Sequence, residues 1–227
     1  MKRLLLSLIF LATALPAFAW TRAAEHRIAL KSAELGPPDL RLVIDHFHDD
    51  YLRGVDLALA DEGSEIHREK LRARIEAESR AIVQMIRANK PMVQVVERLG
   101  ILAHLVGDAN NPYHLGDDAA TRADFEQYFE RKMARFPTFF YGVDRRFALG
   151  AYLDGAFART RKFVAPMAEE YARGSSASFD DRSTAFGVAS VCYSHAVTDI
   201  VNLQYFIWKE AGGNVRKVPQ SIVLNGN

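Results

Sequence analysis

Helical periodicity along almost the whole chain is the feature that most constrains its fold. Strand patterns are nearly absent: no run of Val, Ile and Thr alternates strictly with polar residues, and no Asn-Gly hairpin signal lies inside the domain. Apolar residues recur instead at helical spacing. The predicted helices span about 39–59, 64–88, 91–108, 121–136, 149–172 and 181–211. This pattern predicts a single all-α, bundle-like domain.

The boundaries of these helices are signalled by turn and cap residues. Thr121 is the expected N-cap of its helix, and Gly212-Gly213 is expected to end the last one. An aromatic loop is expected around 137–146, and the tail after Gly213 is expected to be loose.

The first residues have the pattern of a secretory signal peptide. Lys2 and Arg3 precede an apolar run over 4–15, and Ala17-Phe18-Ala19 is a small-x-small cleavage box. A run of about a dozen apolar residues is too short to span a bilayer, which needs about 20. We therefore expect a signal peptide at 1–19, a single domain at 20–227, and a secreted or periplasmic protein. No later segment is long and apolar enough to span a membrane.

Composition excludes some classes of protein and limits the metal chemistry. The 227 residues carry 29 basic and 28 acidic side chains, so net charge does not favour nucleic acid or anionic membrane as a partner. Loss of Lys2 and Arg3 would change the net charge from +1 to −1. One cysteine, Cys192, allows neither an internal disulfide nor a multi-cysteine zinc site, and is expected to be buried. Any metal ligands must be histidines and carboxylates.

The strongest candidate site is the run His-Leu-Val-Gly-Asp-Ala-Asn-Asn-Pro-Tyr-His at 104–114. His104 and Asp108 are four residues apart, so they share one face of the predicted helix. That helix is apolar almost all round and is expected inside the domain, where a carboxylate is costly unless it is paired or bound to metal. Asn-Asn-Pro can turn the chain so that His114 returns to the same place. A hydrogen-bonded His–Asp pair at a helix end is the structural alternative.

Further candidates lie on either side of this run. They are His26, Asp61, His67 and Glu126, which singly are more typical of a protein surface. Together they supply nitrogen and oxygen ligands, a set that suits zinc and also admits manganese or iron.

The 104–114 run resembles the bacterial zinc-dependent phospholipase C family and the related fungal single-strand-specific zinc nucleases. That family pattern is His, three residues, Asp, then a His six positions later, with Gly before the Asp and Pro two before the last His. Every position matches. The family also has an N-terminal Trp whose amine and carbonyl chelate zinc, and predicted cleavage after Ala19 would expose Trp20.

The resemblance implies an all-α fold with up to three zinc ions in a cleft. One ion would be held by Trp20, His26 and Asp108; a second by Asp61, His67, His104 and Asp108; a third by His114 and Glu126. In this assignment Asp108 bridges two ions. For three of these ligands the assignment rests only on their order along the chain: His26, Asp61 and His67.

The chain departs from the family pattern at the third ion. A second histidine is expected four residues before the glutamate, and Arg122 stands there. Arg122 cannot ligate because it stays protonated, although its guanidinium suits a substrate phosphate. The number of ions, two or three, therefore remains open. The missing histidine ligand of the third ion could be replaced by His195 or by an aspartate (Asp117, Asp118 or Asp124). His195 and His46 each have an aspartate four residues later, and packing is the alternative role of both.

The resemblance implies phosphodiester hydrolysis by a metal-activated water, with Asp61 as the residue that orients or deprotonates that water. A phospholipid is the expected substrate, because Phe125-Glu126 is closer to the phospholipase branch. A single-strand nuclease, with Phe139, Phe140 and Tyr141 stacking on bases, is the second reading. A secreted, non-catalytic metal-binding protein is the third. A monomer is expected in each case.

Overall fold

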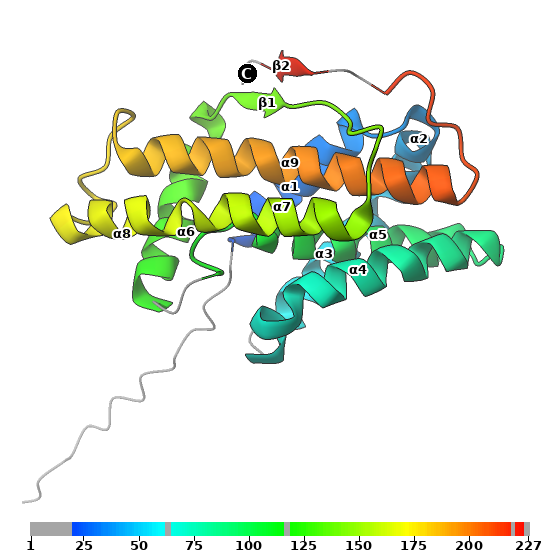
Figure 1. Ribbon diagram of the computed structural model, residues 1–227, viewed down its shortest axis with the longest axis horizontal. Coiled ribbons are helices and arrows are strands. Elements are labelled where there is room, and N and C mark those ends of the chain that lie inside the picture. Colours follow the sequence, from blue (N-terminus) through cyan, green and yellow to red (C-terminus); the bar gives the residue numbers. More distant parts are fainter. Residues whose placement is uncertain (1–19, 62–64, 116–118, 219–220, 225–227) are drawn as a thin grey trace, which may run out of the picture.

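The computed structural model describes residues 20–61, 65–115, 119–218 and 221–224. The predicted signal segment 1–19 lies outside these ranges. The described chain is mostly helical, as predicted, with one pair of short strands (Figure 1). In chain order the elements are α1 (Arg22–Leu35), α2 (Pro38–His46), α3 (His48–Asp61), α4 (Glu65–Arg87), α5 (Met92–Ala109), α6 (Ala119–Lys132), a short 3-10 helix (Met133–Arg135), β1 (Thr138–Phe140), α7 (Leu149–Arg161), α8 (Val164–Arg173), α9 (Thr184–Glu210) and β2 (Ile222–Leu224).

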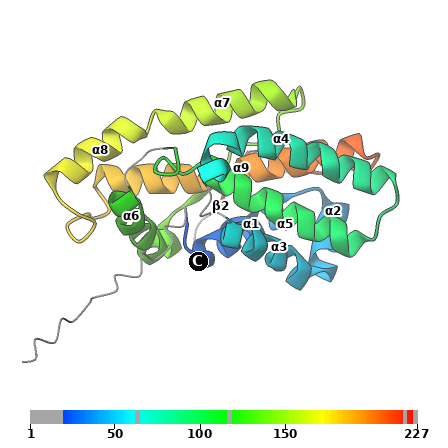
Figure 2. The ribbon, with the colours of Figure 1, turned by 90° about the horizontal axis from the view of Figure 1, so that it is seen from below.

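Helix α5 lies inside the bundle and touches α1, α3, α4 and α9. Figure 2 shows α3 and α4 running beside it. Its last turns, from Leu102 to Ala109, are buried without interruption, which confirms the prediction from its all-round apolar sequence. The two polar side chains in that stretch, His104 and Asp108, are therefore held away from solvent.

Two glycines allow α3 and α5 to cross backbone to backbone. A Cβ atom on Gly54 would lie 1.9 Å from the Glu97 carbonyl oxygen, and one on Gly100 would lie 2.0 Å from the Tyr51 carbonyl oxygen. Neither position has room for a side chain. This reciprocal contact fixes α5 against α3 one turn before His104.

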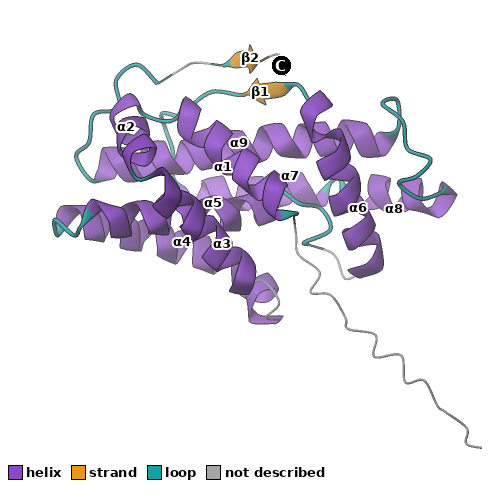
Figure 3. Cartoon of the chain, turned by 180° about the vertical axis from the view of Figure 1, so that it is seen from behind, coloured by secondary structure: helices purple, strands orange, loops and turns teal. Residues whose placement is uncertain are grey.

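A row of polar side chains on α9 holds an extended segment on the outer side of that helix. Ser194 accepts a hydrogen bond from the Phe139 amide (3.1 Å), Thr198 from the Tyr141 amide (3.2 Å) and Asn202 from the Asp144 amide (2.7 Å). The three acceptors are four residues apart and so share one helix face. β1 lies in this segment and pairs antiparallel with β2, as Figure 3 shows above α9. The predicted loose tail thus contains a strand.

Two predicted helices are each broken in two. The 39–59 segment divides between α2 and α3 at Phe47, whose φ of −111° and ψ of 38° leave the helical region. The 149–172 segment divides between α7 and α8 around Lys162 and Phe163. Pro166 explains the second break, because it has no N–H and its ring clashes with the carbonyl four residues earlier.

Other local predictions have mixed outcomes. α1 was not predicted, although Thr21 caps it by accepting a hydrogen bond from the Ala24 amide (3.3 Å). α6 begins at Ala119, so Thr121 lies inside the helix and is not its cap. Cys192 is buried, as predicted. Among the described residues, no helix is both long and apolar enough to cross a bilayer.

Candidate metal centre

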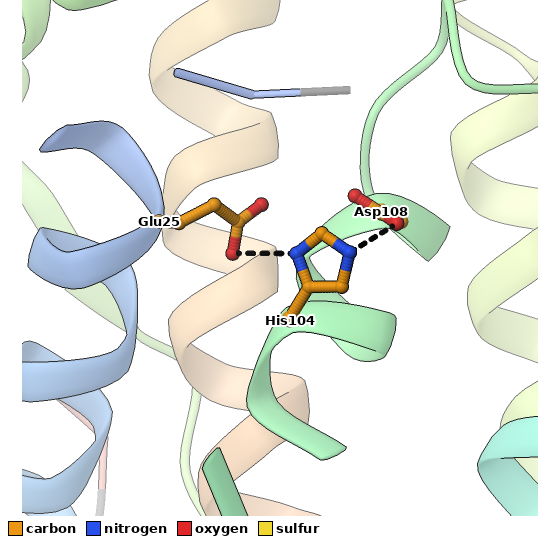
Figure 4. A group of neighbouring side chains, drawn as sticks. All are labelled: Glu25, His104 and Asp108. Carbon is orange, nitrogen blue, oxygen red and sulfur yellow. Dashed lines mark ion pairs between the residues drawn. The ribbon is translucent and has the colours of Figure 1, made fainter. Parts of the chain in front are cut away.

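The three residues that come closest to a metal site are Glu25 on α1 and His104 and Asp108 on α5 (Figure 4). The imidazole lies between the two carboxylates: Nε2 is 3.1 Å from Asp108 Oδ2, and Nδ1 is 3.5 Å from Glu25 Oε2. One ligand atom from each residue falls within 4.8 Å of the others. All three side chains are almost completely buried. The spacing of His104 and Asp108 predicted this pair, but not the third member.

Gly107 and Trp20 bring α1 and the chain that precedes it against the end of α5. A Cβ atom on Gly107 would lie 3.3 Å from both Glu25 carboxylate oxygens, so glycine leaves room for this carboxylate. The Trp20 indole Nε1 donates to the Gly107 carbonyl (3.0 Å), and its ring packs against Phe129 with centroids 4.1 Å apart. Trp20 is fully buried. The predicted mature N-terminus is therefore anchored one residue from Asp108.

His114 returns to the cluster through a tight turn after α5. The Asn111 side chain accepts from the Tyr113 amide (2.9 Å), and its carbonyl accepts from the His114 amide (3.1 Å). This turn is typical of asparagine. His114 Nε2 lies 4.0 Å from Asp108 Oδ2, so Asp108 has an imidazole on each side.

Glu126 and Arg122 lie one helical turn apart on α6 and are both buried. The Arg122 Nε donates to the Tyr113 carbonyl (3.2 Å). Glu126 Oε1 is buried without a hydrogen-bond partner among the described residues. Burial raises the pKa of Glu126 to about 8; the Arg122 charge opposes this rise, and the charges of Asp108 and Glu25 add to it. The carboxylate of Glu126 therefore interacts electrostatically with those of Asp108 and Glu25.

The carboxylates of the cluster raise the pKa values of their neighbours. Burial raises the pKa of Glu25, and the negative charge of Asp108 adds to the effect. Burial alone would lower the pKa of His104, but the charges of Asp108 and Glu25 outweigh it and raise the pKa well above its ordinary value. Without another cation, this group therefore retains protons near neutral pH.

This donor set fits a divalent cation. Three buried carboxylates (Glu25, Asp108 and Glu126) lie near two histidines and one guanidinium, and neither Glu25 oxygen accepts a hydrogen bond within the described chain. Buried carboxylates that lack donors are costly unless they are protonated or coordinate a metal. Imidazole and carboxylate are zinc ligands, and a manganese or iron site uses the same atoms.

The structure does not bring His26 or Asp61 into this group. His26 Nε2 lies 2.8 Å from Asp56 Oδ1 on α3, and this Asp also pairs with Arg22. Asp61 is exposed at the end of α3 and pairs with Arg74 (3.0 Å). His67 belongs to α4, but its side chain lies outside the described part of the chain, as do Asp117 and Asp118.

The substitute ligands considered for the third ion also lie elsewhere. His195 stacks on Tyr141 with ring centroids 4.5 Å apart, and His46 is an exposed residue at the end of α2. The Asp124 carboxylate accepts hydrogen bonds from the Ser176 amide (3.0 Å) and hydroxyl (2.6 Å).

Glu25 is the site residue that sequence reasoning missed. It precedes His26, which offered the more obvious metal ligand. Glu25 lies on the same stripe as the buried Ala24, Ile28 and Ala29, and His26 lies outside it. The sequence does signal Glu25, because it is a charged residue on the apolar face of α1. This signal can be read only after the α1 helix has been predicted.

Comparisons with models of protein families, with curated proteins and with solved structures give no match.

Proposed function

We propose that this protein is a zinc-dependent phosphodiester hydrolase, most similar in chemistry to phospholipase C. The observation that carries the proposal is the buried Glu25–His104–Asp108 cluster with its excess of carboxylate charge. The match of residues 104–114 to the phospholipase C and zinc nuclease pattern supports the choice of reaction.

In this proposal zinc would be held by Glu25, His104 and Asp108, with His114 as a further ligand close to Asp108. His104 Nε2 lies 3.1 Å and His114 Nε2 4.0 Å from Asp108 Oδ2, and one Glu25 oxygen lies within 4.8 Å of ligand atoms of both His104 and Asp108. In this proposal Glu25 takes the role that the sequence order gave to His26. The α-amino group of Trp20, created by cleavage after Ala19, would add a further ligand, which the anchored indole supports. When bound, zinc supplies a Lewis acid for the phosphoryl oxygens and an activated water.

The protein side chains around the ions have separate roles. Asp108 lies at Nε2 of His104 and Glu25 at Nδ1. When one of these nitrogens ligates zinc, the carboxylate at the other would orient the ring. Arg122 is held by the Tyr113 carbonyl beside Glu126, where its positive charge can orient the substrate phosphate. Because Arg122 stands where a third-ion ligand is expected, the arrangement favours two ions over three.

Metal analysis of protein that begins at Trp20 tests the metal part of this proposal. At least two zinc ions per chain are expected, and His104→Ala should lower that number while His48→Ala, an exposed histidine, should not. Protein that retains a methionine before Trp20 should lose one ion, because its amide nitrogen is no longer an amine. A zinc content near zero in correctly processed protein would contradict the enzyme proposal.

A single-strand nuclease is the second candidate, favoured by the exposed aromatic side chains of Phe139 and Tyr141 (38% and 48% exposed). Phe140, the third aromatic of that run, is buried in the core. Hydrolysis of phosphatidylcholine and of single-stranded DNA by the zinc-loaded protein separates the two. We expect the lipid to be the better substrate; hydrolysis of DNA alone would reverse the ranking. Full zinc content without either activity would favour a non-catalytic metal-binding protein.

A further inference from the structure

A basic pocket lies away from the metal cluster, between the β1–α7 connection and the chain that follows α9. It has a volume of about 620 Å³, within the range of ligand sites. The polar and aromatic side chains that line it are those of Tyr141, Arg145, Tyr205, Arg216, Lys217 and Ser221. No residue of the Glu25–His104–Asp108 cluster contributes to it. Figure 1 shows the chain after α9 turning back above that helix, on the side where the β1–α7 connection runs.

The charge of this pocket is positive and is not balanced within the described chain. Arg145, Arg216 and Lys217 make no ion pair with any described residue, and no lining residue is acidic. Arginines elsewhere are mostly paired, as Arg53 is with Asp50 and Glu97. Three cations around one concavity repel each other, and a bound anion would offset that repulsion.

One wall of the pocket is held in place by α9. Asn202 donates to the Gly142 carbonyl (3.1 Å) and accepts from the Asp144 amide (2.7 Å). Gly142 has a φ of +95°, a backbone conformation that side chains with Cβ rarely adopt. The backbone that carries Tyr141 and Arg145 is therefore fixed before a ligand arrives, which lowers the entropy cost of binding.

We propose that this pocket binds a phosphate group. Guanidinium groups bind phosphate oxygens through paired N–H donors, a lysine adds a point charge, and the Tyr205 and Ser221 hydroxyls can donate to the remaining oxygens. Three cations match the double charge of a phosphate monoester better than the single charge of a carboxylate. The volume leaves room for an organic group on the phosphate, with the Tyr141 and Tyr205 rings as its apolar surface. The phosphate can belong to a soluble ester or to a lipid headgroup, and the inference does not depend on the proposed hydrolase activity.

Chemical-shift mapping on the isotope-labelled, zinc-loaded chain tests the pocket at residue level. The probes are inorganic phosphate, and vesicles of phosphatidylcholine with and without phosphatidic acid. Phosphate is expected to shift the amides of Gly142, Val143 and residues 215–217 in a saturable way. Binding of phosphatidic acid vesicles through these residues, in preference to vesicles of phosphatidylcholine alone, would assign the lipid source. Binding of phosphate with no preference between the two kinds of vesicle would assign the soluble one.

A triple variant and a charge-matched control decide the outcome. Arg145→Gln/Arg216→Gln/Lys217→Gln should weaken phosphate binding at these amides at least about tenfold. Arg41→Gln/Lys90→Gln/Lys162→Gln removes the same charge from exposed positions outside the pocket and should leave binding unchanged. Absence of shifts at these amides, or equal weakening by both triple variants, would overturn the proposal. Shifts confined to residues around Asp108 would likewise overturn it, whatever the protein hydrolyses.

Discussion

Two helices of this protein each carry a histidine followed four residues later by a buried aspartate, and the two pairs differ completely in their surroundings. On α5, His104 contacts Asp108 directly (3.1 Å). On α9, His195 instead stacks on Tyr141, and Asp199 accepts a hydrogen bond from the Tyr152 hydroxyl. The same spacing therefore gives a candidate metal centre on α5, whereas on α9 it gives a buried aspartate with a structural role.

The difference lies in the hydrogen-bond donors that reach each carboxylate. Asp199 accepts from the Tyr152 hydroxyl (2.7 Å), the side-chain Nδ2 of Asn110 (3.0 Å) and the Arg159 guanidinium. Burial raises the pKa of Asp199, while Arg159 and these hydrogen bonds oppose the rise. Its charge is thus compensated from within the protein.

Around Asp108 the neighbours are further carboxylates and histidines. Glu25 and Glu126 add negative charge to that of Asp108, so three carboxylates share one nearby guanidinium, that of Arg122, whereas Asp199 has that of Arg159 to itself. A buried acid that the protein itself neutralises is a structural element, whereas a group of buried acids left short of cations is suited to bind one. This comparison makes four predictions, described from the largest expected effect to the smallest.

The largest contrast is expected in zinc binding. Asp108→Asn should weaken zinc binding at least about a hundredfold, because it removes the ligand that both histidines face. Asp199→Asn should leave zinc affinity within about twofold, since its partners lie outside the cluster. Competition with a chelator of known affinity measures both. Equal losses in the two variants would show that the sites are not distinct.

The second contrast concerns stability without metal. Arg159→Met should lower the free energy of unfolding by about 2–3 kcal/mol, because it removes the cation that compensates Asp199; the partial exposure of Arg159 keeps the effect below that of a fully buried pair. Asp108→Asn should cost less than Arg159→Met in metal-free protein, because the relief of repulsion among Glu25, Asp108 and Glu126 offsets the weakened contact with His104. Urea unfolding measures both, with the exposed Arg161→Met as control. A larger loss for Asp108→Asn than for Arg159→Met would contradict the charge argument.

The third contrast is in pH dependence. The pKa of Glu126 is raised to about 8 in the folded protein, so its folded state binds a proton that the unfolded chain releases at lower pH. The resulting stability is present at low pH and is lost as the pH rises through about 8. Metal-free protein should therefore be less stable at pH 8.5 than at pH 6, by about 1–2 kcal/mol, and zinc should remove the difference.

Glu126→Gln serves as the matched variant for this pH effect, because a neutral amide does not titrate. Its metal-free stability should vary less between pH 6 and pH 8.5 than that of the parent protein. If both proteins lose the same stability over this range, Glu126 is not the titrating group.

The smallest effect is expected at His195. Burial and the charge of Arg159 lower its pKa to about 4, so it is neutral at physiological pH and contributes mainly its stacking on Tyr141. His195→Ala should cost about 1 kcal/mol or less and leave zinc content unchanged. Loss of a zinc ion in this variant would place His195 among the ligands after all.

The sequence predicted the α5 half of the site because its signals are local. An apolar helix with His and Asp four apart, followed by Asn-Asn-Pro, specifies burial, a shared face and a return of the chain within a short segment. The helical class followed in the same way from periodicity. These features need no knowledge of the rest of the fold.

The remainder depends on contacts between distant segments. Glu25 belongs to the site only because α1 crosses α5 at Gly107, and Asp199 is structural only because α7 supplies Tyr152 and Arg159. The spacing of His195 and Asp199 carries no sign of those donors. The β1–β2 pair was missed because each strand is three residues long, and because β1 is held by side chains of α9, which are distant in sequence.

Anomalous diffraction at the zinc edge, from crystals of the zinc-loaded protein that begins at Trp20, tests the central claim most directly. The account predicts a peak bonded to His104, Asp108 and Glu25 at about 2.0–2.2 Å, with no peak near Asp199. The contrary result would be crystals in which anomalous peaks show zinc elsewhere on the protein and none at the cluster. That result would contradict the assignment of Glu25, His104 and Asp108 as a metal centre.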